Sequence, residues 1–150
     1  MVKDNPFHPA VIITTLLFLV IGGCVGKSPP SRFYRLTSIL ETQSGIQVKP
    51  TQDIAVGIGP VTIADYLDQT QIVTRSSENK IEQAEFDQWS GTFKNNVTEV
   101  LAANIGDLLG SERISIYPWR SYISVEYQVL VDVSRCDGQL GKDAVLAVRW

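Results

Sequence analysis

The residue in the most distinctive chemical setting is Cys24, which follows a short apolar run and two glycines near the N-terminus. A secretory signal needs a positively charged start, an apolar stretch of about 7 to 15 residues and small residues at the cleavage point. Lys3 supplies the charge, residues 10–21 supply the apolar stretch, and Gly22 and Gly23 supply the small residues. The pattern therefore predicts export, with a thiol at the first position after the cut.

The sequence Ile21-Gly22-Gly23-Cys24 resembles the lipobox of bacterial lipoproteins. The resemblance implies that the thiol is joined to diacylglycerol, and that Cys24 becomes the first residue of the mature, acylated protein. Each buried methylene adds about 0.8 kcal/mol of membrane affinity, and more than one chain makes the anchoring stable. An uncleaved membrane-spanning helix is the alternative, although residues 9–25 fall short of the roughly 20 apolar residues that such a helix needs.

The predicted lipobox divides the chain into three segments. Residues 1–23 are expected to be the signal peptide, and residues 24–31 the lipidated cysteine with a flexible tether. Glycine and serine make that tether flexible, while its two prolines favour extended chain. Residues 32–150 are expected to form one domain, because their number fits a single hydrophobic core.

Composition argues against several classes of function. The net charge is −3 and no basic patch suggests nucleic-acid binding. The single histidine, His8, lies inside the predicted signal, which leaves the domain without a Ser/His/Asp triad, a Cys/His dyad or a histidine metal site. With Cys24 lipidated, Cys136 has no disulfide partner and is expected to be a small buried hydrophobe. We expect the protein to have no enzymatic activity, and to carry no metal and no cofactor besides the acyl lipid.

Two weaker motifs do not change this expectation. Gly57 and Gly59 lack the third glycine and the helix of a dinucleotide site, so they are expected to allow close backbone approach within a sheet. Several carboxylates are clustered in the sequence, but their spacing fits no calcium loop and no catalytic pair. Solvated surface is the expected role of these acids, which are Asp65, Asp68, Glu82, Glu85 and Asp87.

Hydrophobic periodicity predicts an α+β domain. Apolar residues at three- and four-residue intervals predict one clear helix over residues 91–109, with Ser90 as its N-cap and Gly110 just after its end. Residues 54–61 are expected to form a buried strand that ends at Pro60. The other predicted strands are residues 33–36, 71–75, 81–86, 113–119, 125–133 and 144–150, and residues 41–50 are a predicted polar connection.

An ordered set of short motifs is similar to one known family. The motifs are Cys24, Phe33-Tyr34-Arg35-Leu36, Val56-Gly57-Ile58-Gly59-Pro60-Val61, Asp65-Tyr66-Leu67-Asp68, Gln71-Ile72-Val73-Thr74-Arg75, Trp89, Tyr117-Pro118-Trp119 and Trp150. Together they resemble the ABC-type transport auxiliary lipoproteins, the PqiC family. The resemblance implies an α+β fold with a mixed or mostly antiparallel sheet and packed helices. Because members continue beyond the position of Trp150, we expect the domain to be incomplete at its C-terminus.

The resemblance also implies a function. It implies a non-enzymatic lipoprotein that faces the periplasm from the bacterial outer membrane and assists MCE-domain proteins in lipid transport, thereby supporting envelope integrity. Val25 is compatible with the outer membrane, because the usual inner-membrane retention residue at that position is aspartate. We expect a docking module held at the membrane by its lipid; a periplasmic lipid carrier with an apolar pocket is the alternative.

Three aromatic residues near predicted loop ends are the candidate partner contacts: Tyr66, Trp119 and Tyr122. Aromatic side chains are enriched at protein interfaces, although they also fill ordinary cores. The sequence determines neither the partner's identity nor whether the chain forms a homo-oligomer.

Overall fold

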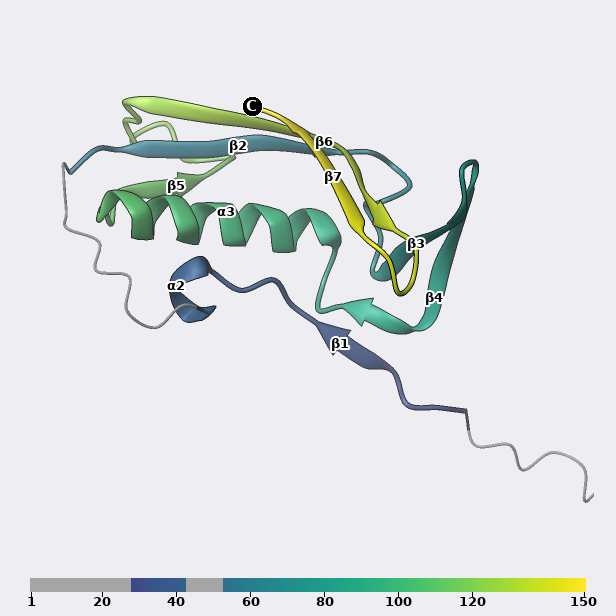
Figure 1. Ribbon diagram of the computed structural model, residues 1–150. Helices are drawn as coiled ribbons and strands as arrows, with labels where there is room; N and C mark the ends of the chain where they lie inside the picture. The colour runs from purple at the N-terminus through teal and green to yellow at the C-terminus, as the bar shows by residue number, and fades with distance from the viewer. Residues whose placement is uncertain (1–27, 43–52) are drawn as a thin grey trace, which may run out of the picture. The chain divides into compact units, whose positions relative to one another are not determined.

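The computed structural model describes residues 28–42 and 53–150 (Figure 1). The chain divides into two compact units, residues 1–30 and 31–150, and the elements described below belong to the second. The predicted signal, Cys24 and most of the predicted connection at residues 41–50 lie outside the described residues. Within the described ranges, no helix is long and apolar enough to cross a membrane.

The described residues of the second unit form two sheets and two helices, so the predicted α+β class is confirmed. The elements are β1 (Arg32–Tyr34), α2 (Ile39–Thr42), β2 (Val56–Ile63), β3 (Gln71–Ser77), β4 (Lys80–Trp89), α3 (Phe93–Leu109), β5 (Ile114–Ile116), β6 (Tyr127–Gly138) and β7 (Ala144–Arg149). The small sheet has the strand order β1-β4-β3, and the main sheet has the order β5-β2-β6-β7. Figure 1 shows α3 lying along the main sheet.

Both sheets are mixed, as predicted, but parallel pairs outnumber antiparallel ones. Strand β2 is parallel to both β5 and β6, and β1 is parallel to β4. The two hairpins, β3-β4 and β6-β7, supply the antiparallel pairs. Parallel neighbours need a long connection. Here β3, β4 and α3 lie between β2 and β5 in the chain, and together they form that connection.

Helix α3 begins two residues later than predicted. Thr92, rather than Ser90, is the N-cap, and its side chain accepts a hydrogen bond from the Asn95 backbone N–H. The backbone N–H of Ser90 donates to the Tyr34 carbonyl oxygen at 2.7 Å, so Ser90 still belongs to the small sheet. Gly110 ends the helix as predicted, in the left-handed conformation that a residue without a Cβ adopts most easily.

The prediction that β2 ends at Pro60 is wrong. The strand runs on to Ile63, and its pairing with β6 changes register between Ile58 and Val61. Proline cannot donate to a sheet and is therefore tolerated at such irregularities. Gly59, with φ of +105°, takes a backbone conformation that a residue with a Cβ would rarely adopt.

One hydrophobic core joins the two sheets. Ile58 of β2 and Val133 of β6 are its most completely buried side chains. Phe93, at the start of α3, is 4% exposed, and its ring lies 5.3 Å from that of Trp89 at the end of the small sheet. The other buried members are Val56, Val61, Leu67, Val73 and Val131. Phe93 therefore packs where α3, the main sheet and the small sheet meet.

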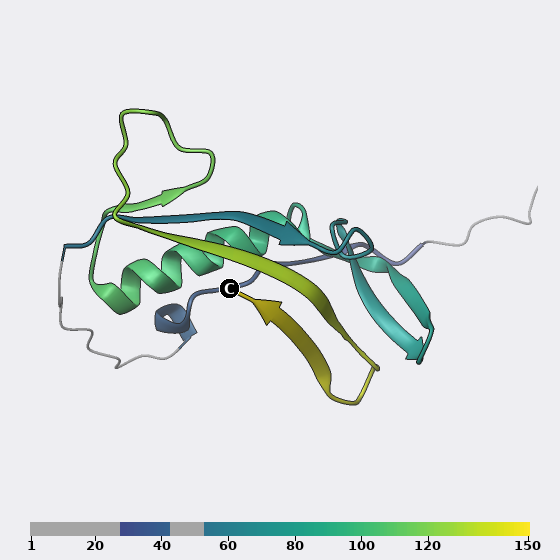
Figure 2. The ribbon, with the colours of Figure 1, turned by 90° about the horizontal axis from the view of Figure 1, so that it is seen from above.

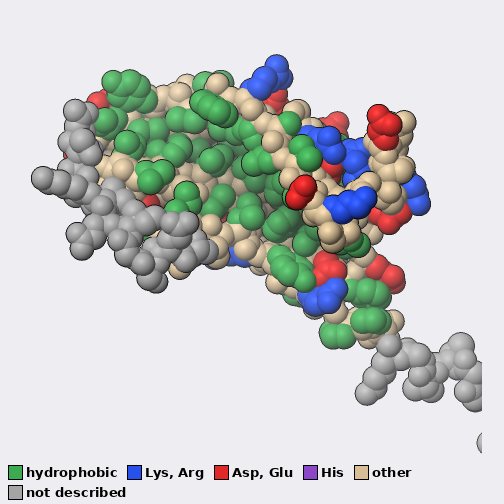
Figure 3. Space-filling model, in the orientation of Figure 1, with side chains coloured by type: hydrophobic (Ala, Val, Ile, Leu, Met, Phe, Trp, Pro, Cys, Tyr) green, Lys and Arg blue, Asp and Glu red, His purple; other side chains and the backbone are tan. Residues whose placement is uncertain are grey.

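Part of the surface is apolar. Helix α3 packs against β2 and β5, on one side of the main sheet. Hydrophobic side chains gather in the middle of the face shown in Figure 3. On β6 and β7, Leu130 and Leu146 are exposed by 55% and 65%. Exposed apolar area of this kind often marks a contact surface in a soluble domain.

Candidate functional site

Two of the three predicted contact residues, Trp119 and Tyr122, lie in the connection between β5 and β6. Figure 2 shows this loop rising away from the main sheet. Both of its ends are hydrogen-bonded to β2 or the residue before it: the Tyr117 N–H donates to the Ile58 carbonyl oxygen at 2.9 Å, and the Glu126 N–H donates to the Ala55 carbonyl oxygen at 2.8 Å. The loop is therefore presented from a fixed base. We call residues 117–122 the aromatic loop.

Trp119 holds the aromatic loop against the sheet. It is half-buried over Gly57 of β2, and a Cβ placed on Gly57 would lie 2.8 Å from the Trp119 ring. The close neighbour of this glycine is therefore the side chain of a loop residue, rather than the backbone within the sheet that was predicted. Tyr117 packs edge-on against Trp119, with ring centroids 5.5 Å apart. The packing fixes where the exposed part of the loop lies.

Replacing Gly57 with alanine is expected to destabilise the protein by about 1 to 3 kcal/mol, because the new methyl group overlaps the Trp119 ring. The Trp119→Ala variant should tolerate the same change much better, since the overlapping ring is gone. Urea unfolding of wild type, the two single variants and the double variant measures this coupling. Strictly additive free energies in that cycle would contradict the packing described.

Apart from Trp119, the aromatic side chains of the aromatic loop are open to solvent. Tyr117 is 52% exposed and Tyr122 is 74% exposed. The guanidinium carbon of Arg120 lies 6.0 Å from the centre of the Tyr122 ring. Tyrosine, tryptophan and arginine are the residues that most often contribute strongly to protein interfaces. The loop combines these residue types with a rigid attachment.

A groove of about 430 Å³ separates the aromatic loop from α3. One wall comes from β2, one from the end of β5 and the loop, and one from the exposed side of the first half of α3. The lining residues are Ile58, Pro60, Val61, Lys94, Asn95, Thr98, Glu99, Ile116, Tyr117 and Pro118. The β2 and β5 walls are apolar, whereas the helix wall carries a cation and an anion. Glu99 lies 3.4 Å from the exposed Arg35.

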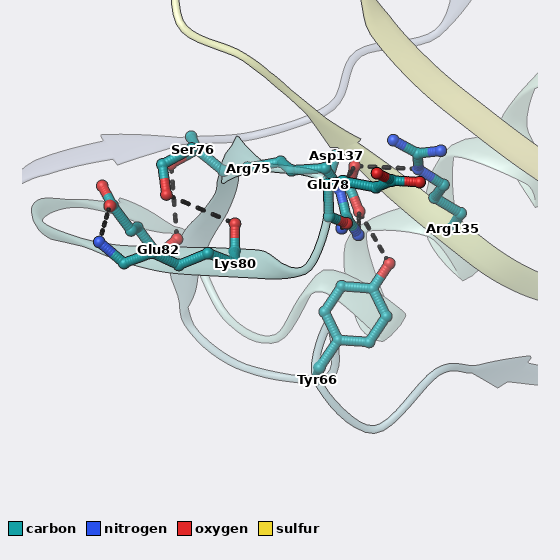
Figure 4. A network of polar contacts seen from close by, with 9 residues as sticks. Tyr66, Arg75, Ser76, Glu78, Lys80, Glu82, Arg135 and Asp137 are labelled. Atoms are coloured by element: carbon teal, nitrogen blue, oxygen red, sulfur yellow. Dashed lines mark hydrogen bonds and ion pairs between the residues drawn. The ribbon is translucent and has the colours of Figure 1, made fainter.

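The third predicted contact residue, Tyr66, lies elsewhere. It follows the C-terminal end of β2, whereas the aromatic loop is attached near the N-terminal end. The Tyr66 hydroxyl donates to Asp137 Oδ2 at 3.0 Å (Figure 4). The structure therefore brings Trp119 and Tyr122 together without Tyr66. The contact role of all three residues stays a prediction.

Asp137 is the centre of a polar network between the two sheets. Its side chain is fully buried. Arg75 of β3 donates to it through Nε at 2.9 Å and Nη2 at 2.8 Å, and Arg135 donates through Nε at 3.0 Å. Among the described residues, no buried side-chain nitrogen or oxygen is left without a hydrogen-bond partner. The carboxylate thus ties β3 of the small sheet to β6 of the main sheet.

The charges in this network are structural. Hydrogen bonds from Arg75 hold the pKa of Asp137 well below its usual range. Burial, together with the hydrogen bond to Asp137, raises the pKa of Tyr66. At neutral pH the carboxyl is ionised and the phenol is protonated, so neither group is tuned for acid-base exchange. Sequence reasoning missed Asp137 because Asp137-Gly138 is typical of a turn.

Other candidate groups have simple roles. Asp87 accepts hydrogen bonds from Arg32 and Tyr34, which tie β1 to β4. Cys136 is a free thiol that packs against the core, and burial raises its pKa. Over residues 28–42 and 53–150, no group of histidine, cysteine or acidic side chains could hold a metal ion.

Comparison with known proteins identifies the family. The sequence pattern of the ABC-type transport auxiliary lipoprotein component matches residues 34–150. The chain belongs to this family. No curated protein matches it in sequence. The resemblance noted from short motifs is therefore confirmed over nearly all of the second compact unit, and the description of the family supports a transport-associated role.

Two crystal structures share the fold of this ABC-type transport auxiliary lipoprotein component. Protein XCC0632 from Xanthomonas campestris, of the family DUF330, is 14% identical, with a TM-score of 0.58 over 79% of this chain. An uncharacterized protein is 12% identical, with a TM-score of 0.56 over 81% of this chain and 78% of its own. The alignment spans 65% of the length of the Xanthomonas protein. At these identities the likeness shows the fold.

Proposed function

We propose that this protein is a non-enzymatic docking module of an ABC-type transport system that moves lipid between the two bacterial membranes. Its family supports a transport-associated role. The observation that carries the docking role is the aromatic loop, whose exposed Tyr117 and Tyr122 are held on a fixed base beside a groove. A rigidly presented aromatic surface suits protein recognition, because little conformational freedom is lost on binding.

The proposed partner is an MCE-domain protein of the envelope. In this proposal Cys24 carries the diacylglycerol and acyl chains that hold the protein at the outer membrane, facing the periplasm. Both proteins are then confined to neighbouring surfaces, which raises their effective concentration. A modest contact would then hold the assembly together and support envelope integrity.

A lipid-carrier role has less support. It calls for an apolar cavity, whereas the hollow beside the aromatic loop is a surface groove with lysine and glutamate in its wall. The core between α3 and the main sheet is instead filled by side chains such as Ile58 and Phe93. Docking therefore accounts for the surface better than carriage of a lipid does.

The anchor is tested by the Cys24→Ala variant. Without the thiol no acyl chain can be attached, so we expect the variant to move from the outer-membrane fraction to the soluble periplasmic fraction. Cell fractionation followed by immunoblotting measures this, and Cys136→Ala is the matched control that should stay in the membrane. Full retention of the Cys24→Ala variant in the membrane would mean that the protein is anchored in another way.

A further inference from the structure

We propose that the groove beside the aromatic loop binds an extended segment of the transport partner, which lies along β2 and places an acidic side chain on Lys94. The proposal rests on the docking function and deepens it, because it names the surface and the chemistry of the segment. The support comes from the edge of β2, the apolar walls and the charge of Lys94.

The first observation is that β5 covers only part of β2. The two strands pair from Val56 to Ile58, after which β5 ends while β2 continues to Ile63. Figure 2 shows β5 beside the first part of β2, and the chain then leaving the sheet. In the described part of the chain, the remainder of β2 has no strand neighbour on this side.

The open part of β2 has backbone groups directed toward the groove. Alternate residues of a strand direct their N–H and C=O groups to opposite neighbours. The Ala64 N–H donates to Val133 of β6 at 3.0 Å, so the alternate residues Val61 and Ile63 direct theirs away from β6, and of these two Val61 lines the groove. An extended segment of the partner that enters the groove would pair with these backbone groups and add a strand beside β2. Addition of a strand to an open edge is an established mode of peptide recognition.

The walls of the groove supply side-chain contacts for such a segment. Ile116 and Tyr117 are 42% and 52% exposed, and Pro60 and Pro118 lie beside them. Side chains on one face of an extended segment, spaced two residues apart, would contact this apolar wall. The other face would remain in solvent.

Charge identifies the polar part of the segment. Lys94 lies on the helix wall of the groove, is exposed, and has no carboxylate within ion-pair distance among the described residues. Glu99, one turn further along α3, already has Arg35 beside it. Among the described residues, the groove therefore offers Lys94 as a cation without an ion-pair partner beside an apolar wall. An aspartate or glutamate in the partner complements it, and such complementarity favours the correct partner over others.

The test is photo-crosslinking in cells. Benzoylphenylalanine replaces Ile116 in the groove in one strain, and Lys142 in the exposed β6-β7 turn in a control strain. We expect position 116, and not position 142, to crosslink to a component of the ABC-type transport system. Mass spectrometry should map the crosslink to a segment with alternating apolar residues and an acidic residue.

Charge variants complete the test. Lys94→Glu should reduce the yield of that crosslink roughly tenfold, because like charges would face each other, while Lys94→Arg should keep it. The groove assignment is overturned if a transport component co-purifies with the lipoprotein but never crosslinks from position 116. It is equally overturned if position 116 captures only a second copy of the chain, a lipid or an unrelated protein. Failure to recover any transport component, by crosslinking or co-purification, would instead reject the docking function.

Discussion

Replacing Asp137 with asparagine is expected to lower the free energy of unfolding by about 3 kcal/mol at pH 7. Removal of one partner from a buried ion pair typically costs 3 to 5 kcal/mol. We expect the lower end of that range, because the side chains of Arg75 and Arg135 are 20% and 41% exposed and regain some hydration. Urea unfolding followed by circular dichroism measures the change.

The effect of Asp137 should depend on pH. Its pKa is lower in the folded protein than in the unfolded chain, where a carboxyl has a pKa of about 3.9. Its stabilisation is therefore complete above that unfolded value and is lost as the pH falls toward the folded one. The difference between wild type and Asp137→Asn should be largest at neutral pH and should shrink below about pH 4.

A matched control isolates the buried charge. Asp143 is exposed in the connection between β6 and β7, and Asp143→Asn should change stability by less than about 0.5 kcal/mol at any of these pH values. If Asp137→Asn were as mild as this control, the network would not be holding the two sheets together.

Replacing Phe93 with alanine is expected to cost about 3 to 5 kcal/mol, the usual range for removing a buried phenylalanine ring. The ring is 4% exposed and packs against Trp89. Because it lies where α3 meets both sheets, its loss should weaken the whole domain rather than one part. Thermal and urea unfolding, followed by circular dichroism and by tryptophan fluorescence, measure both the size of the effect and its cooperativity.

Two comparisons make the Phe93 prediction specific. Phe93→Leu retains most of the buried apolar area and should cost much less than Phe93→Ala. Tyr122→Ala removes a ring that is 74% exposed and should leave stability within about 0.5 kcal/mol. Separate transitions for the two probes in wild type would show that the two sheets unfold independently, contrary to a shared core.

Hydrophobic periodicity identified most of the helices and strands, because the spacing of apolar residues along a segment indicates its secondary structure. The helix over residues 93–109 and the alternating strand that includes Val131 and Val133 have clear apolar repeats. The start of the helix was misplaced because Ser90 and Thr92 are both good caps, and a long-range hydrogen bond from Ser90 to Tyr34 decides between them. The short helix α2 has too few residues to show a repeat.

The candidate site was harder to predict for the same reason. Trp119 and Tyr122 were identified as aromatics near predicted loop ends, but the packing of Trp119 on the sheet depends on Gly57, which is distant in the sequence. Asp137 was missed because its partners Arg75 and Tyr66 come from other elements, and only the tertiary fold brings them together. The groove is likewise invisible in a sequence, since it depends on where β5 ends relative to β2.

The connection between β5 and β6, which contains the aromatic loop, leaves and rejoins the sheet at neighbouring points, beside Ile58 and Ala55. Between those points, the side chains of Trp119 and Val125 pack over Gly57. The loop is thus an exchangeable module: its solvent-facing residues can diverge while β2 and its neighbours keep their register. Under the proposed docking role, a transplanted loop should carry its partner preference with it.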